Sequence, residues 1–197
     1  MNKPTVIVYD FDGTITYKDS FLQFLFHAKG ALRTYLGLAW CSPVILGYKL
    51  GVIANGKAKQ MVFSHFFNGI SETQFNTYCK SFIPKINQIT KPNILKTLQQ
   101  DIADKHQVLI ISASISNWIT PWSETQGISI VLGTELSIKN NRLTGKFATP
   151  NCYGQEKVNR LLEKFPNRDQ YTLIVHGDSA GDKQLLEMAD QKFFYKN

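Results

Sequence analysis

The sequence predicts an α/β protein whose parallel sheet carries an inserted helical domain. In the carboxyl-terminal half, short runs of apolar and β-branched residues alternate with helical patterns. This alternation is typical of a parallel sheet with right-handed crossovers. A similar run at 6–9 stands apart near the amino terminus, and residues 18–90 show helical spacing without the alternation of a strand. We therefore expect a doubly wound, Rossmann-like core of residues 1–17 and 91–197, interrupted by a helical cap of residues 18–90.

The first expected strand ends in two carboxylates. The run at 6–9 leads directly into Asp10, Asp12, Gly13 and Thr14. Open α/β sheets bind ligands beyond the carboxyl ends of their strands, and the two-residue period of a strand places both acids on one side. Adjacent carboxylates repel each other unless a proton or a cation lies between them. The pair predicts a metal ion, a shared proton or both, although the same pattern also occurs as a polar turn.

Helical patterns dominate the expected cap. Asp19 or Ser20 can cap a first helix, and residues 57–67 have helical spacing. A capping-box pattern at 71–74 predicts a further helix that continues to about residue 83.

One apolar segment of the cap, residues 35–53, bears on membrane binding. It barely reaches the ~20 residues of a spanning helix, and it contains Pro43, Lys49 and three glycines. We interpret it as a core helix of the cap or as an interfacial helix, rather than as a membrane span.

The overall charge and the cysteine content limit the classes of partner and the cellular compartment that we expect. The net charge is +7, but the basic residues form no dense tract, so an anionic substrate or an anionic membrane surface is favoured over nucleic acid. The amino terminus lacks a signal-peptide pattern, and three widely spaced cysteines fit reduced, inert thiols. We expect a cytoplasmic protein, with peripheral binding at the inner membrane face as an open alternative.

Strands and helices alternate from residue 91 onward. Pro92 opens an amphipathic helix, and Asn140 with Asn141 marks the turn of a hairpin. In chain order, the further expected elements are a strand at 108–112, a helix from about 116, a strand at 128–132, the hairpin at 136–147, a helix at 155–165, a strand at 171–176, a helix at 180–189 and a short strand at 193–195.

Polar residues follow the ends of these strands. Ser112 ends the strand at 108–112, Asp178 and Asp182 follow the strand at 171–176, and Lys157 lies at the start of the preceding helix. In a doubly wound sheet such ends meet at one crevice, so we expect these side chains beside the first two acids. Taken singly, Ser112 could be a helix cap and Lys157 a solvated lysine.

Taken in order, these motifs resemble the haloacid dehalogenase superfamily of phosphotransferases. They are Asp-Phe-Asp-Gly-Thr at 10–14, Ser112, Lys157 and Gly-Asp-Ser-Ala-Gly-Asp at 177–182. The helical insert resembles the type-one cap of the phosphoserine phosphatase-like branch. Residues 16–20, the apolar cap segment and residues 152–158 resemble bacterial phosphatidylglycerophosphatase-type members. One departure is that no cap arginine matches the residue expected to hold phosphoserine, since Arg33 lies in a different context.

The resemblance implies a Mg²⁺-dependent phosphatase that forms an aspartyl-phosphate intermediate. Asp10 would be the nucleophile, and Asp12 would protonate the leaving oxygen and then take a proton from the hydrolytic water. Mg²⁺ is a hard, oxygen-liganded ion that is usually shared with substrate phosphate. Its implied ligands are Asp10, the backbone carbonyl of Asp12, Asp178 and, directly or through water, Asp182. The implied phosphate-binding residues are Thr14, Ser112 and Lys157.

The substrate remains open at the level of sequence. The apolar cap segment and the positive charge favour a lipid phosphate such as phosphatidylglycerophosphate, and a small soluble phosphomonoester is the alternative. A phosphorylatable receiver domain also combines acids, a hydroxyl and a lysine on a parallel sheet, but it is smaller and has no helical insert. A non-enzymatic membrane-surface protein would leave the four motifs without a purpose.

Overall fold

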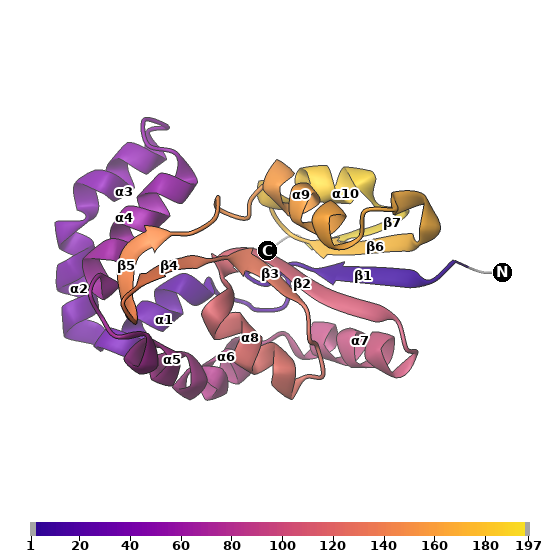
Figure 1. Ribbon diagram of the computed structural model, residues 1–197, viewed down its shortest axis with the longest axis horizontal. Helices are drawn as coiled ribbons and strands as arrows, with labels where there is room; N and C mark the ends of the chain where they lie inside the picture. Colours follow the sequence, from indigo (N-terminus) through magenta and orange to yellow (C-terminus); the bar gives the residue numbers. More distant parts are fainter. Residues whose placement is uncertain (1–2, 196–197) are drawn as a thin grey trace.

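A parallel sheet between two layers of helices forms the centre of the computed structural model, which describes residues 3–195 (Figure 1). Within that part of the chain, the strand order is β3-β2-β1-β6-β7 and all pairings are parallel. The strands are β1 (Thr5–Tyr9), β2 (Gln107–Ile115), β3 (Val131–Thr134), β6 (Thr172–Gly177) and β7 (Gln191–Phe194). The predicted α/β fold with a doubly wound sheet is confirmed.

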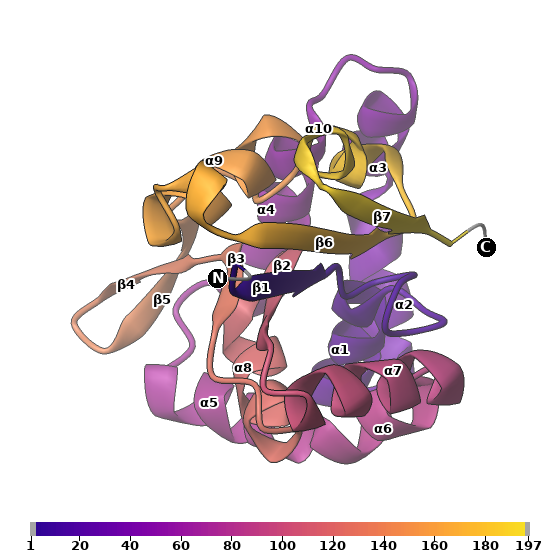
Figure 2. The same cartoon turned by 90° about the vertical axis from the view of Figure 1, so that its right-hand side faces the viewer.

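Both faces of the sheet are covered, as Figure 2 shows most clearly. Val6 and Val8 of β1 belong to the apolar cluster on the side of α9 and α10, whereas Ile7 and Tyr9 belong to the cluster that includes α7 and α8. This alternation is the two-residue period of a strand buried on both faces. The covering helices are α7 (Pro92–Ala103), α8 (Ser116–Thr125), α9 (Gln155–Lys164) and α10 (Lys183–Met188), with short 3-10 helices η1 (Arg168–Gln170) and η2 (Ala180–Asp182).

A helical lobe is inserted between β1 and α7. The Asp19 carboxylate accepts a hydrogen bond of 2.9 Å from the backbone N–H of Leu22, which identifies Asp19 as the cap of the first helix. Ser71 likewise accepts one of 3.2 Å from the backbone N–H of Gln74. The helices are α1 (Ser20–Lys29), α2 (Ala31–Trp40), α3 (Ser42–Lys49), α4 (Asn55–Phe67), α5 (Glu72–Ser81) and α6 (Ile83–Ile89).

The apolar segment 35–53 forms two short helices rather than one long one. α2 ends at Trp40, and Pro43 lies in the first turn of α3, where its missing N–H removes no helical hydrogen bond. None of the helices in the described part of the chain is both long and apolar enough to cross a membrane.

The helical lobe and the sheet share one apolar core. Phe24 of α1 stacks on Trp118 of α8 with ring centroids 4.6 Å apart, and both side chains are fully buried. The two chain segments that enter and leave the lobe also pair, since the backbone N–H of Tyr17 donates to Ile89 and that of Lys91 to Ile15, both at 2.8 Å. These contacts fix the start of α1 next to the end of β1.

A β-hairpin reaches from the sheet to the helical lobe. Its strands, β4 (Leu136–Lys139) and β5 (Arg142–Phe147), meet at Asn140 and Asn141, whose φ angles of 51° and 57° fit the expected turn. β5 lies against α4, where the backbone N–H of Phe147 donates to the Gln60 side chain at 3.0 Å. The hairpin was predicted from the sequence, but its contact with the helical lobe was not.

Some element boundaries differ from the sequence prediction. β3 begins at Val131 rather than at residue 128, and β2 continues to Ile115, which pairs with Thr134 after a shift in register. The helix expected at 180–189 is η2 followed by α10, and the described last strand, β7, begins at Gln191 rather than at residue 193. None of these shifts moves a motif residue away from the carboxyl end of the sheet.

Candidate active site

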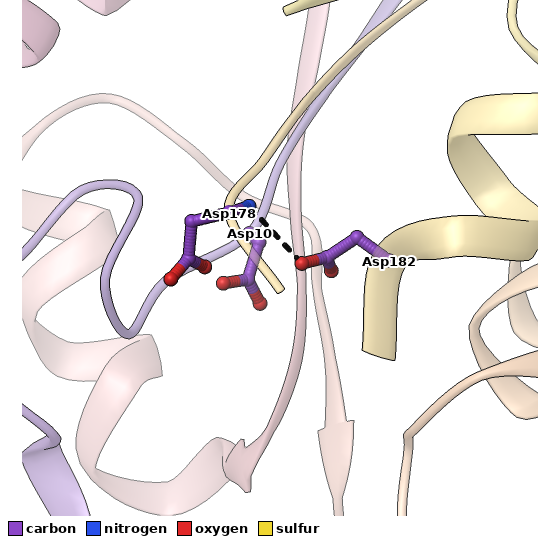
Figure 3. A group of neighbouring side chains, drawn as sticks. All are labelled: Asp10, Asp178 and Asp182. Carbon is purple, nitrogen blue, oxygen red and sulfur yellow. Dashed lines mark hydrogen bonds between the residues drawn. The ribbon is translucent and has the colours of Figure 1, made fainter. Parts of the chain in front are cut away.

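Three carboxylates from separate motifs meet at the carboxyl end of the sheet. Asp10 follows β1, and its backbone N–H continues the pairing with β6 by donating to the His176 carbonyl at 2.9 Å. Asp178 follows β6, and Asp182 is the last residue of η2. One carboxylate oxygen from each of the three lies within 4.8 Å of the others (Figure 3). The sequence expectation that these distant residues gather at one point agrees with this geometry.

A buried lysine joins two of these acids. Lys157 is on the first turn of α9 and is 2% exposed. Its Nζ donates to Asp10 Oδ1 and to Asp182 Oδ1, each at 2.5 Å, and to the Ile111 carbonyl at 3.1 Å. Burial alone would lower the pKa of Lys157, but the two carboxylates hold it above its ordinary value. Lys157 is therefore a fixed positive charge in the centre of the site.

The three carboxylates outnumber the single ammonium group of Lys157, and the pKa values of two of them are raised. Burial, reinforced by Asp182, raises the pKa of Asp10 despite the opposing effect of Lys157. Burial and Asp182 also raise the pKa of Asp178. Although burial opposes its ionisation, Lys157 and the hydrogen bonds from Ser179 hold the pKa of Asp182 below its usual range.

The cluster fits a divalent cation. Its donors are carboxylate oxygens that repel one another, and Mg²⁺ prefers oxygen ligands and often shares them with a phosphate. Asp10 and Asp178 would hold the ion. Asp182 already accepts from the backbone N–H of Asp178 at 3.2 Å and from the Ser179 hydroxyl at 2.9 Å, so it also orders the loop that carries Asp178.

The turn after β1 is held by hydrogen bonds to the same acids. The Thr14 hydroxyl is buried and lies 3.2 Å from Asp178 Oδ1 and 3.4 Å from Asp10 Oδ2. Gly13 has a φ of 87°, which L-residues other than glycine rarely adopt. The Lys91 ammonium donates to the Gly13 carbonyl from the start of α7. The turn is therefore tied both to Asp10 and Asp178 and to the connection that leaves the helical lobe.

Asp12 has a separate set of partners. Its Oδ1 accepts a 2.6 Å hydrogen bond from the backbone N–H of Ser20, and its Oδ2 accepts from the Ser114 hydroxyl. Trp118 Nε1 donates to the Ser20 hydroxyl at 3.1 Å and so extends this network. β1 ends at Tyr9, so the strand alternation that was expected to align Asp12 with Asp10 does not reach it. The metal role that the resemblance implies for the backbone carbonyl of Asp12 stays a prediction.

The protonation of Asp12 differs from that of an exposed carboxylate. Burial, with a smaller effect of Asp19, raises the pKa of Asp12 to about 6, and the hydrogen bond from Ser114 opposes the rise. A carboxyl group with a pKa near the working pH can both give and take a proton.

A cavity of about 200 Å³ lies between the acids and the helical lobe. Ser112 lies on its wall and is otherwise buried, and its hydroxyl accepts from the Ser114 backbone N–H at 3.1 Å. The side chains and backbone that line the cavity come from Asp10, Asp12, Asp19, Asn55, Lys59, Ser112, Ala113, Tyr153, Lys157, Ser179 and Gly181.

Several of these residues were not singled out from the sequence. Lys59 of α4 lines the cavity, and its Nζ donates to the Ala113 carbonyl at 3.1 Å. It supplies a cation from the helical lobe, whereas Arg33 lies on the exposed face of α2 and is not among the lining residues. Ser114, which contacts Asp12 but does not line the cavity, could have been found because it follows Ser112 by two residues and a strand places both on one side. Lys59 and Tyr153 carried no comparable signal.

His176 is a packing residue. Its ring is stacked between Tyr9, at 4.2 Å, and Phe193, at 4.6 Å. Its Nδ1 lies 2.7 Å from the Tyr195 hydroxyl, on the side of β6 opposite the acids of the site.

Fold and site together define an α/β enzyme with a carboxylate-rich centre at the carboxyl end of a parallel sheet, beneath a helical lobe. The chain belongs to the haloacid dehalogenase-like hydrolase family, whose model matches residues 7–187. The family predicted from the four motifs is thereby confirmed, and so is the prediction that the protein is an enzyme.

Individual proteins extend this likeness over nearly the whole chain. Protein CicA of Caulobacter vibrioides is 28% identical over 193 residues, which are 97% of this chain and 86% of the relative. A solved protein of unknown function from Bordetella pertussis Tohama I has a TM-score of 0.85 at 17% identity, with 97% of this chain and 89% of that chain covered. A phosphoserine phosphatase solved as a phospho-aspartyl intermediate analogue has a TM-score of 0.62 at 14% identity, with 97% and 86% covered. The last two likenesses establish a shared fold.

Proposed function

We propose that this hydrolase is a Mg²⁺-dependent phosphomonoesterase that forms a phosphoaspartyl intermediate on Asp10. The observation that carries the proposal is the position of the Asp10 carboxylate, which meets Lys157 on one side and Asp178 on another and also lines the cavity. A phosphate dianion repels an anionic nucleophile, so attack requires positive charge at this point. A bound Mg²⁺ would supply part of that charge, and Lys157 supplies the rest.

In the first step, an Asp10 oxygen attacks phosphorus and the ester P–O bond breaks. Asp12, held by Ser20 and Ser114, gives its proton to the departing oxygen and becomes a carboxylate. Ser112 and Thr14 would contact the phosphoryl oxygens, and Lys157 would offset their charge.

In the second step, water attacks the phosphoaspartyl group. Asp12 takes a proton from that water as the new P–O bond forms, and the Asp10–phosphorus bond breaks to release inorganic phosphate. Both carboxyl groups then return to their starting states. The raised pKa of Asp12, about 6, suits a group that must act once as an acid and once as a base.

For the substrate we propose a lipid phosphate whose phosphomonoester enters the cavity. The cavity wall includes Asn55, whose side-chain N–H donates at 3.0 Å to the Tyr48 hydroxyl at the edge of the apolar α3 region. Polar cavity residues therefore lie next to the apolar α3 region, which supports a ligand with both a phosphate and an apolar part.

A small soluble phosphomonoester is the second candidate. Asp19 and Lys59 both line the cavity, and this pair of opposite charges would complement an amino-acid phosphate such as phosphoserine. The name of the phosphatase that shares the fold supports the same candidate.

The chemistry is tested by phosphoenzyme trapping with an aryl phosphate, whose leaving group needs little protonation. Asp12→Ala is expected to accumulate protein that carries one extra phosphoryl group by mass, because hydrolysis of the intermediate loses its base. Asp10→Asn, the matched control, is expected to carry none and to lose kcat by roughly 10⁴-fold or more. Chelation of Mg²⁺ should stop turnover of the unaltered enzyme.

Three outcomes would contradict the chemistry: turnover that survives chelation, full activity in Asp10→Asn, or a phosphoryl group on a residue other than Asp10. A single phosphorylation without repeated turnover would favour a receiver domain instead. The two substrates are then separated by comparing kcat/KM for phosphatidylglycerophosphate in mixed micelles with that for phosphoserine.

A further inference from the structure

One face of α2 presents large apolar side chains to solvent. Leu32, Tyr35, Leu36 and Trp40 recur at helical spacing along one side of α2, and their exposed fractions run from 63% to 78%. Leu46 of α3, with Leu50 and Val52 of the following loop, extends this exposed set. We call the seven residues the α2–α3 surface; they are Leu32, Tyr35, Leu36, Trp40, Leu46, Leu50 and Val52.

The fold fixes this face outward. On the opposite side of α2, Thr34 and Gly37 are buried. A Cβ at Gly37 would lie only 2.3 Å from the Phe66 ring of α4, so the two helices are in close contact there. α2 therefore cannot turn to bury its apolar side without losing that contact. Figure 1 shows α2 and α3 at the outer edge of the helical lobe, and in both overall views the loop after α3 projects beyond its neighbours.

The stretch of sequence that contains the α2–α3 surface carries basic residues but no acidic ones. Residues 20–71 contain no Asp or Glu. Arg33 lies on the exposed side of α2 and Lys49 at the exposed end of α3. The basic residues of this stretch are Lys29, Arg33, Lys49, Lys57 and Lys59.

An exposed apolar helix face beside basic residues is typical of helices that bind at a membrane surface. Interfacial helices place an apolar face at the boundary between headgroups and acyl chains and carry Lys or Arg alongside it. Trp and Tyr, here Trp40, Tyr35 and Tyr48, are favoured at that depth because each has an apolar ring and a polar group. Short helices that are too short to span a bilayer are sufficient for such binding.

We propose that the α2–α3 surface docks peripherally on an anionic lipid bilayer. The apolar side chains would enter the headgroup boundary, while Arg33 and Lys49 would meet lipid phosphates. A second copy of this chain is a poorer occupant, because a two-fold contact through this surface would bring the same cations together. Docking itself does not require catalysis. The corollary, that docking brings lipid phosphates to the cavity through the Tyr48–Asn55 side, rests on the proposed function.

Vesicle sedimentation of the full chain tests the docking. Vesicles of phosphatidylcholine alone are compared with vesicles that contain about one-third phosphatidylglycerol, at low and high salt. The protein is expected to sediment with the anionic vesicles. High salt should weaken this binding, because it screens the attraction between the basic side chains and the lipid phosphates. The double variant Leu36→Ser, Trp40→Ser should lower the partition coefficient by roughly tenfold to a hundredfold. Both side chains are mostly exposed, so the thermal unfolding midpoint should change little.

Phe194→Ser is the matched control, because it removes a half-exposed aromatic side chain from β7, far along the chain from the α2–α3 surface. It should bind vesicles like the unaltered protein. Docking is overturned if the unaltered protein stays in the supernatant with anionic vesicles, or if the double variant binds as tightly as the control.

Gel filtration adds a third outcome. A dimer that dissociates in the double variant would assign the surface to a second copy and overturn docking on lipid. Turnover of a soluble aryl phosphate separates this inference from the proposed function. Vesicle binding without any turnover would support docking and refute the phosphatase. Turnover without vesicle binding would support the phosphatase and refute docking.

Discussion

Lys157 shows how a single buried charge organises the site. A lysine without partners would lose its proton in this environment, but Asp10 and Asp182 both accept from it at 2.5 Å. Removing one member of such a buried set leaves the others uncompensated, which is strongly destabilising. Lys157 therefore positions Asp10 and, through Asp182, the loop of Asp178 at the same time.

His176 gives a prediction at the same scale, on the dependence of stability on pH. Burial lowers the pKa of His176 from 6.5 to about 4, so the folded protein binds this proton less readily than the unfolded chain. The resulting stability is present above pH 6.5 and is lost as the pH falls toward 4. We expect unfolding titrations to lose up to about 3 kcal/mol from this residue across that window.

The control is His176→Phe, which keeps a ring between Tyr9 and Phe193 but cannot titrate. Its free energy of unfolding should fall less steeply between pH 6.5 and 4 than that of the unaltered protein. Parallel curves for the two proteins would show that His176 does not titrate in this range.

The sequence predicted those site residues that follow strand ends. Asp10 and Asp178 occupy such positions, whereas Lys157 lies at the start of a helix, and the geometry of a doubly wound sheet brings these positions together. Ser20 and Lys59 could not be found in this way, because their places depend on how the helical lobe folds back over the sheet. The catalytic and metal-binding roles given to the motif residues stay predictions.

At the scale of elements, the contact between β2 and β3 is unusually close. A Cβ at Gly133 of β3 would lie 2.9 Å from the Ser114 carbonyl and 3.0 Å from the Ser116 backbone nitrogen. Backbone atoms cannot turn aside as a side chain can. We expect Gly133→Ala to lower the free energy of unfolding by about 1–3 kcal/mol, and to reduce turnover because Ser114 holds Asp12.

Gly47→Ala is the comparison for this substitution. A Cβ there would approach within 2.8 Å of the Ile53 side-chain terminus, which is flexible, and alanine favours the helix by about 1 kcal/mol over glycine. Its chemical denaturation midpoint should stay level or rise. Equal losses of stability in both variants would rule out the rigid β2–β3 contact as the cause.

Element types were more predictable than element ends. The hairpin turn was evident because Asn140 and Asn141 tolerate positive φ. The start of β3 was set too early, because the apolar pattern at 128–132 does not show where pairing with β2 begins. The division of the apolar segment at Cys41 has a local signal in Pro43, which lies in the first turn of α3.

For the whole molecule, a metal ion held by the acid cluster would couple metal binding to stability. A ligand that binds only the folded state stabilises it, by about 2.7 kcal/mol at a hundred times its dissociation constant. We expect Mg²⁺ to raise the thermal unfolding midpoint. Asp178→Asn should abolish that rise and, without Mg²⁺, should itself raise the midpoint, because it removes a negative charge that burial and Asp182 disfavour.

Asp169→Asn provides the control, since it removes the same charge from an exposed position in η1. It should respond to Mg²⁺ as the unaltered protein does. A Mg²⁺ response that persists in Asp178→Asn would show that the ion binds elsewhere.

The fold class of the whole chain followed from alternating patterns, and the family match bears it out. The division into a core of residues 1–17 and 91–197 and a cap of residues 18–90 stays a prediction. The sharing of one apolar core between the lobe and the sheet, through Phe24 and Trp118, could not be read from periodicity, which shows that a face is apolar but not what covers it.

The central place of β1 in the sheet has a consequence for biosynthesis. β1 is translated before both of its neighbours in the sheet, since Tyr9 pairs with Ile110 and Thr5 with Thr172, which follow much later in the chain. Contacts between residues so far apart form slowly. The nascent β1 therefore stays apolar and unpaired while the helices that follow it are synthesised. A chaperone that shields β1 during this time would protect the growing chain from aggregation.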